Sequence, residues 1–393
     1  MVAEFSKDWP GILRVATPEE LAAALQDWKQ APVVGVDTES NSFFAYSERL
    51  CLLQISCGEN DYVVDPLALG EELRAINPLL AARRPVKVFH AAEFDLMLLK
   101  KDLGAQVGGL FDTQVAMTLL QYERTGLAVL IETCYGLKLS KKEQRSDWGR
   151  RPLREEQIEY ARLDTHFLAD LYQRLSSELR EKGLMEAAEG EFRRLEREVL
   201  PARQPDPEGW RRLKGARTLG PAALARLQAL FQWREETGRR KDLAVYRVLS
   251  NQALVELAAH PPRDLAGLAG CRGVGWRKAR QAGGEILAAL HAVDGKEVVM
   301  TRPTLSRGQR QHFRAVRQNQ EALRKWRKTL AMDLGLPPER LIHRRHLEEI
   351  GKKLPRTSED LNRLVILTDW QRENLETSLL EILEKLPEPK DED

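Results

Sequence analysis

A proline-rich stretch at residues 201–209, PARQPDPEG, separates two parts of the chain that differ in their sequence patterns. Three prolines and a glycine placed so closely cannot continue a helix or a strand, so they indicate a linker between domains. Before the linker, short apolar runs alternate with amphipathic helical patterns, which is typical of an α/β layer structure. After it, almost every segment has helical periodicity. The 393 residues therefore predict an α/β domain at residues 1–204 followed by all-α helical bundles.

Four short apolar runs in the first part are predicted strands: residues 33–37, 52–56, 62–65 and 86–89. Asp37 and Glu39 lie at the end of the first of them. Residues two apart in a strand point to the same face, and two acids there repel each other unless a cation neutralises them. A solvated strand end with two surface acids is the alternative, which this pair alone does not exclude.

A third acid, Asp95, falls on a predicted helix at residues 91–101 that Gly104 ends. Leu98 and Leu99 lie one turn further on, so Asp95 faces inward or borders the apolar face of the helix. An exposed helix acid is the alternative, and Glu93 is expected to be one.

The fourth acid, Asp164, lies on a predicted amphipathic helix at residues 153–175. Tyr160 precedes it by one helical turn and therefore shares its face. A carboxylate and a phenol arranged in this way can hold a metal ion and a water together, although spacing alone also permits a simple Tyr-Asp surface pair.

These acids stand in three motifs, VDTE at residues 36–39, HAAEFD at 90–95 and YARLD at 160–164. In this order and spacing the motifs resemble those of the DEDD exonuclease superfamily, and the tyrosine marks its DEDDy branch. The stretch SDWGRRPL at residues 146–153 resembles ribonuclease D more specifically. One position departs from the family pattern, because Ala91 follows the motif histidine where many relatives have Asn. That departure puts a substrate contact from this position in doubt.

The resemblance implies an RNase H-like mixed sheet and a 3′-to-5′ direction of hydrolysis. It also implies that two divalent cations, Mg²⁺ or Mn²⁺, are held by Asp37, Glu39, Asp95 and Asp164, and that the Tyr160 hydroxyl orients the attacking water. The chemistry is consistent with this, since two cations roughly 3.5 to 4 Å apart can stabilise both the entering and the leaving oxygen of a phosphodiester. Hard cations prefer oxygen ligands, and no Cys/His cluster with zinc-ligand spacing is present.

Several other residues of the first part have two readings each. Asp112 directly precedes an apolar helical run, so we expect an N-cap rather than a catalytic group. His90 either contacts substrate or is a hydrogen-bonded histidine at a strand end. Phe43 and Phe44 could stack on a terminal base, but core packing is the commoner role of such a pair.

Residues 210–295 resemble the HRDC domain, a small helical bundle that occurs in ribonuclease D and in RecQ-type helicases. The run ALFQWREETGRRKDLAVYRVLSNQAL and the turn Gly273-Val274-Gly275 carry this resemblance. The turn opens a helix whose free amides could bind a phosphate together with Arg272 and Lys278, or it is only a tight helix-helix turn. We name Arg272, Gly273, Gly275 and Lys278, with His90, as candidate substrate-binding residues.

Residues 305–388 resemble a second, more divergent HRDC copy, in which EALRKWRKTLAMDLGLPPERLIHRRHLEEI repeats the Trp-Arg helix, the loop and the next helix. The glycine turn is replaced there by LVILTDWQRENL, so a structural or RNA-end-positioning role is as plausible as phosphate binding.

The net charge of +2 hides an uneven distribution, with −7 up to residue 204, +6 over residues 205–300 and +3 over the remainder. A basic appendage can attract a polyanion that the acidic catalytic part cannot, although solvated helix faces are the alternative. No apolar run approaches the roughly 18 residues of a membrane span, and the N-terminal segment lacks a signal-peptide core. With four unpatterned cysteines, a cytoplasmic monomer without membrane contact is the expectation.

The sequence thus predicts a metal-dependent 3′-to-5′ exoribonuclease that releases nucleoside 5′-monophosphates from RNA 3′ ends, with transfer RNA precursors and other small structured RNAs as substrates. A DNA 3′-to-5′ exonuclease of the Werner type shares the metal chemistry and is the first alternative. A non-catalytic RNA-binding scaffold is the second, and the retention of all four acids counts against it.

Overall fold

The computed structural model of the chain describes residues 11–201, 204–300, 306–364 and 367–389. Residues 1–10, for which the sequence predicts no signal peptide, lie outside this part. Among the described residues, no helix is both long enough and apolar enough to cross a membrane.

The first part of the chain forms a six-stranded mixed sheet with the strand order β1-β4-β3-β2-β5-β6. The pairs β2–β3 and β3–β4 are antiparallel, whereas β1–β4, β2–β5 and β5–β6 are parallel. The strands are β1 (Ile12–Val15), β2 (Val33–Ser40), β3 (Leu50–Cys57), β4 (Asn60–Val64), β5 (Val86–Phe89) and β6 (Leu110–Asp112). The predicted strands are all present, and β2 is longer than expected, so Asp37 and Glu39 lie within it rather than at its end.

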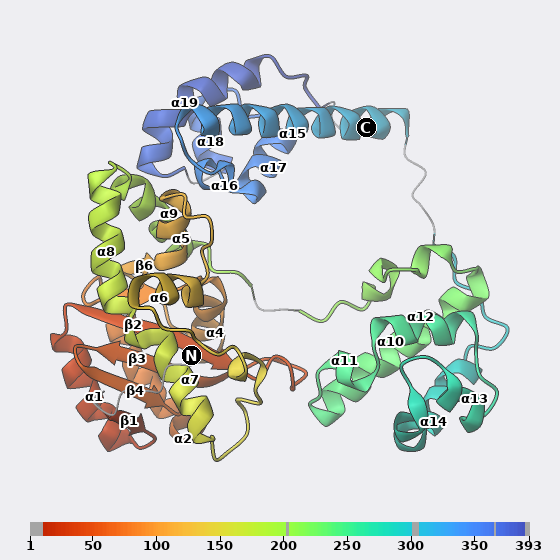
Figure 1. Cartoon of the computed structure of the whole chain (residues 1–393). Coiled ribbons are helices and arrows are strands. Elements are labelled where there is room, and N and C mark those ends of the chain that lie inside the picture. Colours follow the sequence, from red (N-terminus) through yellow and green to blue (C-terminus); the bar gives the residue numbers. More distant parts are fainter. Residues whose placement is uncertain (1–10, 202–203, 301–305, 365–366, 390–393) are drawn as a thin grey trace.

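Helices cover both faces of this sheet (Figure 1). Helices α7 and α8 pack against β2 on one face, and α4 packs against the same strand from the other. The helices of this part are α1 (Pro18–Gln30), α2 (Pro66–Leu69), α3 (Asn77–Ala81), α4 (Glu93–Leu103), α5 (Thr113–Leu119), α6 (Leu127–Tyr135), α7 (Glu155–His166), α8 (Leu168–Glu181) and α9 (Met185–Arg197), with short 3₁₀ turns η1 (Gly70–Ile76) and η2 (Glu143–Arg145). This arrangement confirms the predicted α/β layers.

Two predicted helices have different bounds in the structure. The single helix expected at residues 153–175 is two helices, α7 and α8, separated at Phe167. The break lets α7 lie over β3 and β4 while α8 runs over β2 and β5, which one straight helix could not do. The helix expected from Ala91 begins only at Glu93, because Ala91 has a positive φ of 63° that no right-handed helix accommodates.

Beyond the linker, the chain forms two helical bundles. The first contains η3 (Gly209–Arg212), η4 (Ala216–Thr218), α10 (Pro221–Lys241), α11 (Val245–Val248), α12 (Asn251–Ala259), α13 (Leu265–Gly270) and α14 (Gly275–His291). The second contains α15 (Arg307–Asp333), α16 (Pro338–Leu341), α17 (Arg344–Lys353), α18 (Ser358–Leu364) and α19 (Asp369–Glu384). In Figure 1 the second bundle lies next to α9 of the α/β domain, and the first bundle lies apart from the second.

The two bundles have different cores. Trp210, Leu227 and Leu254 belong to an apolar cluster that is confined to the first bundle. In the second bundle, Leu323 and Leu375 belong to the same continuous cluster as the core of the α/β domain. The second bundle is therefore part of the hydrophobic core of the α/β domain, whereas the first has a core of its own.

Candidate functional site

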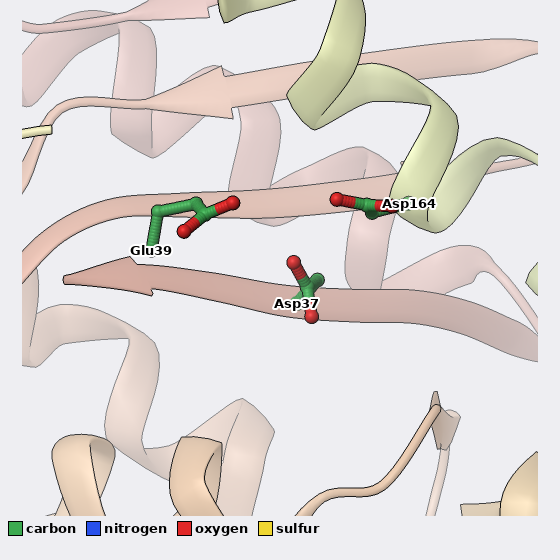
Figure 2. A group of neighbouring side chains, drawn as sticks. All are labelled: Asp37, Glu39 and Asp164. Atoms are coloured by element: carbon green, nitrogen blue, oxygen red, sulfur yellow. The ribbon is translucent and has the colours of Figure 1, made fainter. Parts of the chain in front are cut away.

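Three of the four predicted acids converge where strand β2 passes under helix α7. Carboxylate oxygens of Asp37, Glu39 and Asp164 all lie within 4.8 Å of one another. Figure 2 shows the side chains of Glu39 and Asp164 directed toward each other, with Asp37 on the same strand as Glu39 beside them. The period of two along β2 places both of its acids on the face that α7 covers. Oxygen ligands so close together suit a hard divalent cation.

The structure does not bring Asp95 into this group of three. Asp95 lies on α4, and its Oδ1 accepts hydrogen bonds from the backbone N–H of Thr38 (3.1 Å) and from the Thr38 hydroxyl. Thr38 stands between Asp37 and Glu39 on β2, so its side chain points to the opposite face. Asp95 is nonetheless near enough for its charge to raise the pKa values of Asp37, Glu39 and Asp164.

The electrostatics of the four acids favour bound cations. Burial raises the pKa of Asp37 and of Glu39 well above the ordinary range, and the neighbouring carboxylates raise both further. Burial also raises the pKa of Asp95 to about 7, against the opposing hydrogen bonds from Thr38. The pKa of Asp164 is raised to about 7 by burial as well. Carboxyl groups with raised pKa values lose their protons more easily when a cation lies beside them, so the site favours a bound cation.

Tyr160 lies one turn before Asp164 on α7, as predicted, and its hydroxyl is close enough to the Asp164 carboxylate for each group to shift the pKa of the other. Burial raises the pKa of Tyr160, and the charges of Asp164, Glu39 and Asp37 raise it further. The phenol therefore stays protonated and can act as a hydrogen-bond donor, not as a base. Trp148, whose ring centre is 6.1 Å from that of Tyr160, supports the ring from the SDWGRRPL stretch.

Gln54 supplies an independent test of whether this site fits a hydrated cation. It lies on β3 directly opposite Asp37, so both side chains point to the same face of the sheet. Its side chain is fully buried, yet neither Nε2 nor Oε1 has a hydrogen-bond partner within the described part of the chain. A buried amide without partners costs about 1–3 kcal/mol. Waters held by a cation at Asp37 would satisfy it, so the residues present fit the group that the acids suggest.

A buried polar network, not anticipated from the sequence, fixes helix α7 on the sheet. Asp61 on β4 accepts hydrogen bonds from Arg162 Nε (2.7 Å) and from the Ser56 hydroxyl (2.6 Å), and it pairs with His166 Nδ1 at 2.8 Å. Ser56 is also 2.7 Å from the hydroxyl of Thr165. Because these partners flank Asp164 in the sequence, the network sets the position of its carboxylate. No spacing rule links Asp61 to α7, which is why sequence reasoning missed it.

The loop that follows β2 is held by the first helical bundle. The carbonyl oxygen of Phe43 accepts hydrogen bonds from Tyr246 Oη and Arg247 Nε, both at 2.7 Å. The carbonyl oxygen of Phe44 accepts one from the Ala244 N–H at 3.0 Å. The Arg247 guanidinium lies 3.9 Å from the centre of the Phe44 ring. Phe43 is 43% exposed, so the expected core packing of this pair is wrong. The first bundle thus fixes the backbone immediately after β2, the strand that carries Asp37 and Glu39.

The remaining candidates of the α/β domain have structural partners. Asp112 caps α5, as predicted, by accepting hydrogen bonds from the backbone N–H groups of Gln114 and Val115. It also accepts hydrogen bonds from the N–H groups of Ala91 and Ala92 and so holds the turn that precedes Asp95. His90 Nδ1 is 2.9 Å from the Thr113 hydroxyl. A substrate contact from His90 stays a prediction.

The phosphate-binding candidates of the first bundle lie at the start of α14, on a different domain from the acids. Gly273 and Gly275 both have positive φ, at 84° and 69°, so the turn requires glycine. Arg272 is exposed and Lys278 is half-buried. The structure places these residues together but not at the acidic site, and their role in phosphate binding stays a prediction.

Comparison with known proteins places the chain among nucleases. Residues 13–180 match the 3′-5′ exonuclease family, and residues 223–290 and 318–387 each match the HRDC domain. Ribonuclease D of Gluconacetobacter diazotrophicus is 34% identical over 292 residues, which cover 72% of this chain and 73% of that protein. Exosome complex exonuclease RRP6 of Saccharomyces cerevisiae is 36% identical over 279 residues, or 67% of this chain and 38% of that protein. The chain spans about a third of the length of such exosome relatives.

A solved structure supports the same placement. The crystal structure of Escherichia coli RNase D, described as an exoribonuclease involved in structured RNA processing, superposes with a TM-score of 0.63. It is 25% identical, and the match covers 96% of this chain and all of that one. The predicted fold, an RNase H-like exonuclease domain followed by helical HRDC domains, is confirmed by these matches. The chain belongs to the ribonuclease D family of 3′-5′ exonucleases.

Proposed function

We propose that this protein is a metal-dependent 3′-to-5′ exoribonuclease that hydrolyses RNA 3′ ends to nucleoside 5′-monophosphates. The observation that carries the proposal is the group of three half-buried carboxylates, Asp37, Glu39 and Asp164, whose oxygens lie within 4.8 Å of one another. The relatives named ribonuclease D, and the RNase D structure that matches over the whole chain, support RNA as the substrate.

In this proposal Asp37, Glu39 and Asp164 hold the cations directly, and Asp95, whose charge acts on all three, adds the fourth carboxylate of the set. Two divalent cations, Mg²⁺ or Mn²⁺, would stabilise the entering and leaving oxygens of the scissile phosphate when bound. Tyr160 keeps its proton and orients the attacking water through its hydroxyl. Gln54 offers an amide donor and an acceptor beside Asp37 for the waters around the site. Asp61 acts only by positioning α7.

The proposal is tested by digesting RNA labelled at the 5′ or at the 3′ end, with and without divalent cation. We expect mononucleotide release from the 3′ end that needs Mg²⁺ or Mn²⁺. Changing a group that merely supports a metal ligand typically costs 10–100-fold, so replacing the ligands themselves by Asp37→Asn or Asp164→Asn is expected to cost more than about 100-fold. Circular dichroism should show both variants folded. Wild-type rates in either variant would refute the assignment of the acids.

Matched DNA oligonucleotides decide the main alternative, a DNA 3′-to-5′ exonuclease. Equal or faster degradation of the DNA strand would favour it. Strong RNA binding without any cation-dependent product would favour a non-catalytic scaffold instead.

The finer assignments belong to the same proposal. They are the trimming of transfer RNA precursors and other small structured RNAs, a monomeric state and a cytoplasmic location. They also include the division of the chain into an exonuclease domain at residues 1–204 and HRDC domains at 210–295 and 305–388. Limited proteolysis at the 201–209 linker tests the first of these boundaries.

A further inference from the structure

Helix α15 (Arg307–Asp333) consists of two halves with different surroundings. From Asn319 onward, its buried residues Asn319, Leu323, Arg327 and Ala331 recur every four positions and anchor it in the second bundle. Before Asn319, residues 307–318 include no buried side chain. Figure 1 shows α15 as a long helix that extends past the other helices of its bundle. Residues 307–318, here called the arm, contribute nothing to the core and need another explanation.

The arm carries a single-sign stripe of charge. Arg307, Arg310, Arg314 and Arg317 follow one another at spacings of three, four and three residues, which places them along one face of the helix. No acidic residue occurs between residues 306 and 320. At 1.5 Å per residue the stripe is about 15 Å long. Each neighbouring pair of like charges costs roughly 0.2–0.5 kcal/mol.

Other exposed helices of the chain compensate such charges internally. Arg174 pairs with Asp170 at 2.9 Å, Arg344 with Glu348 at 2.7 Å and Arg363 with Glu359 at 2.6 Å, each across one helical turn. Within the described part of the chain, the side chains of Arg307, Arg314 and Arg317 have no ion-pair or hydrogen-bond partner. The arm therefore differs from an ordinary solvated helix face, on which opposite charges alternate.

An exposed aromatic ring borders the stripe. Phe313 follows Arg310 by three residues and precedes Arg317 by four, so it lies beside both, and it is 50% exposed. Its ring meets that of His312 edge-on, with 5.8 Å between the ring centres. Arginines that track a phosphate backbone, beside aromatic rings on which bases stack, are the usual components of a single-strand nucleic-acid surface.

We propose that the arm, residues 307–318, binds the phosphate backbone of the RNA substrate upstream of the 3′ end that is being hydrolysed. This inference rests on the proposed function for the identity of the polyanion. Because the terminal nucleotide occupies the acidic site, only RNA long enough to leave that site can reach the arm. The arm therefore increases the affinity for long RNA and leaves the hydrolysis of very short RNA unchanged.

The test compares two full-length variants with the same change in charge. Arg307→Gln, Arg314→Gln and Arg317→Gln are combined in the test variant. Lys352→Gln, Lys353→Gln and Arg363→Gln are combined in the control, because these cations are exposed on other helices of the same bundle. Binding of a labelled 30-nucleotide RNA is measured without divalent cation over a range of salt concentrations. Each phosphate contact contributes about 0.7 to the slope of log affinity against log salt for single strands, so the test variant should lose about two units of slope and at least about tenfold in affinity.

Kinetics and a second variant sharpen the result. The test variant should show a raised KM for the 30-nucleotide RNA and an unchanged kcat/KM for a tetranucleotide. Phe313→Leu should weaken binding of the long RNA without changing the salt slope, since it removes stacking and no charge. Equal slopes for the test and control variants would overturn the inference. Polyglutamate, another polyanion, should displace the RNA from the wild type at a higher affinity than from the test variant, and equal affinities would also overturn the inference. If the wild type yields no product from either RNA, the proposed function fails, whereas the salt slopes still decide whether the arm binds RNA.

Discussion

The two helical bundles match the same domain family but are attached to the catalytic domain in opposite ways. The first has a closed apolar core and contacts the loop after β2 through hydrogen bonds and the Arg247–Phe44 contact. The second shares one apolar cluster with the α/β domain and adds charged contacts, such as Arg345 and His346 with Glu198. The second bundle shares the apolar core of the α/β domain. The first bundle holds the loop after β2, the strand that carries Asp37 and Glu39.

Each attachment contains a glycine that permits close approach. A Cβ on Gly190 of α9 would stand 2.8 Å from the Cβ of Thr368, which begins α19. A Cβ on Gly238 of α10 would stand 3.0 Å from the ring of Tyr46 in the loop after β2. The first contact joins two helices of the shared core, whereas the second joins a bundle to an active-site loop. Disturbing each should therefore have different consequences.

The largest effect is expected from truncating buried leucines in the two cores. Leu375→Ala in the second bundle and Leu254→Ala in the first should each cost about 2–5 kcal/mol, since both side chains are fully buried. We expect calorimetry to show two unfolding transitions. Leu375→Ala should lower the one in which exonuclease activity is lost, and Leu254→Ala should lower the other. If both variants lower the same transition, the two bundles do not differ as described.

A smaller loss of stability is expected at the close contact of α9 with α19. Gly190→Ala should cost about 1–3 kcal/mol because the added methyl group overlaps Thr368. Gly284→Ala in α14 is the matched control, since nothing lies within 4 Å of its added Cβ, and it should stabilise by about 0.4–1 kcal/mol. Chemical denaturation measures both, and equal effects of the two changes would argue against tight packing at Thr368.

At the other attachment the expected change is in activity. Arg247→Ala removes the contact with the Phe44 ring and a hydrogen bond to the Phe43 carbonyl, which on an exposed side chain should cost on the order of 1 kcal/mol, or about fivefold in kcat/KM. Stability should change little. Arg211→Ala is the control, because the contacts of Arg211 with the Trp210 ring and with Glu208 both lie outside the α/β domain. Equal activity in both variants would show that the first bundle does not position the loop.

The smallest effect is the stabilisation by bound cation. Asp95 and Asp164 have pKa values raised to about 7, so the metal-free folded protein retains protons that the unfolded chain releases near pH 4. Their contribution to stability is present at low pH and is lost as the pH rises through 7. At pH 8, Mg²⁺ at a concentration equal to its dissociation constant should stabilise the protein by about 0.4 kcal/mol. The same Mg²⁺ concentration should stabilise it less at pH 5, where the carboxylates keep their protons. Only the transition that includes the catalytic domain should respond, and an equal response of the first bundle would place the cation elsewhere.

Local patterns in the sequence predicted most of the fold and the acids. The two-residue spacing of Asp37 and Glu39 in the β2 run predicted that both lie on one face of the strand. The one-turn spacing of Tyr160 and Asp164 predicted that both lie on one face of the helix. Contacts between distant segments were not predictable in this way. Nothing in the sequence around Asp61 indicates that its carboxylate binds Arg162. Likewise, nothing in the sequence around Phe43 indicates that its carbonyl accepts a hydrogen bond from Arg247, some two hundred residues later in the chain. The break at Phe167 was also missed, because the apolar periodicity continues through it.

The amide of Gln54, which has no hydrogen-bond partner among the described residues, lowers the thermal stability of the cation-free protein. Replacing it with Met keeps its length and removes the buried polar group, so the cation-free enzyme should resist heat better than the wild type. In the proposed mechanism Gln54 binds water beside Asp37, so the same replacement should lower the affinity for the cation. A chain selected only for stability would lose this glutamine, and its presence in the middle of β3 is what the proposed cation site would require.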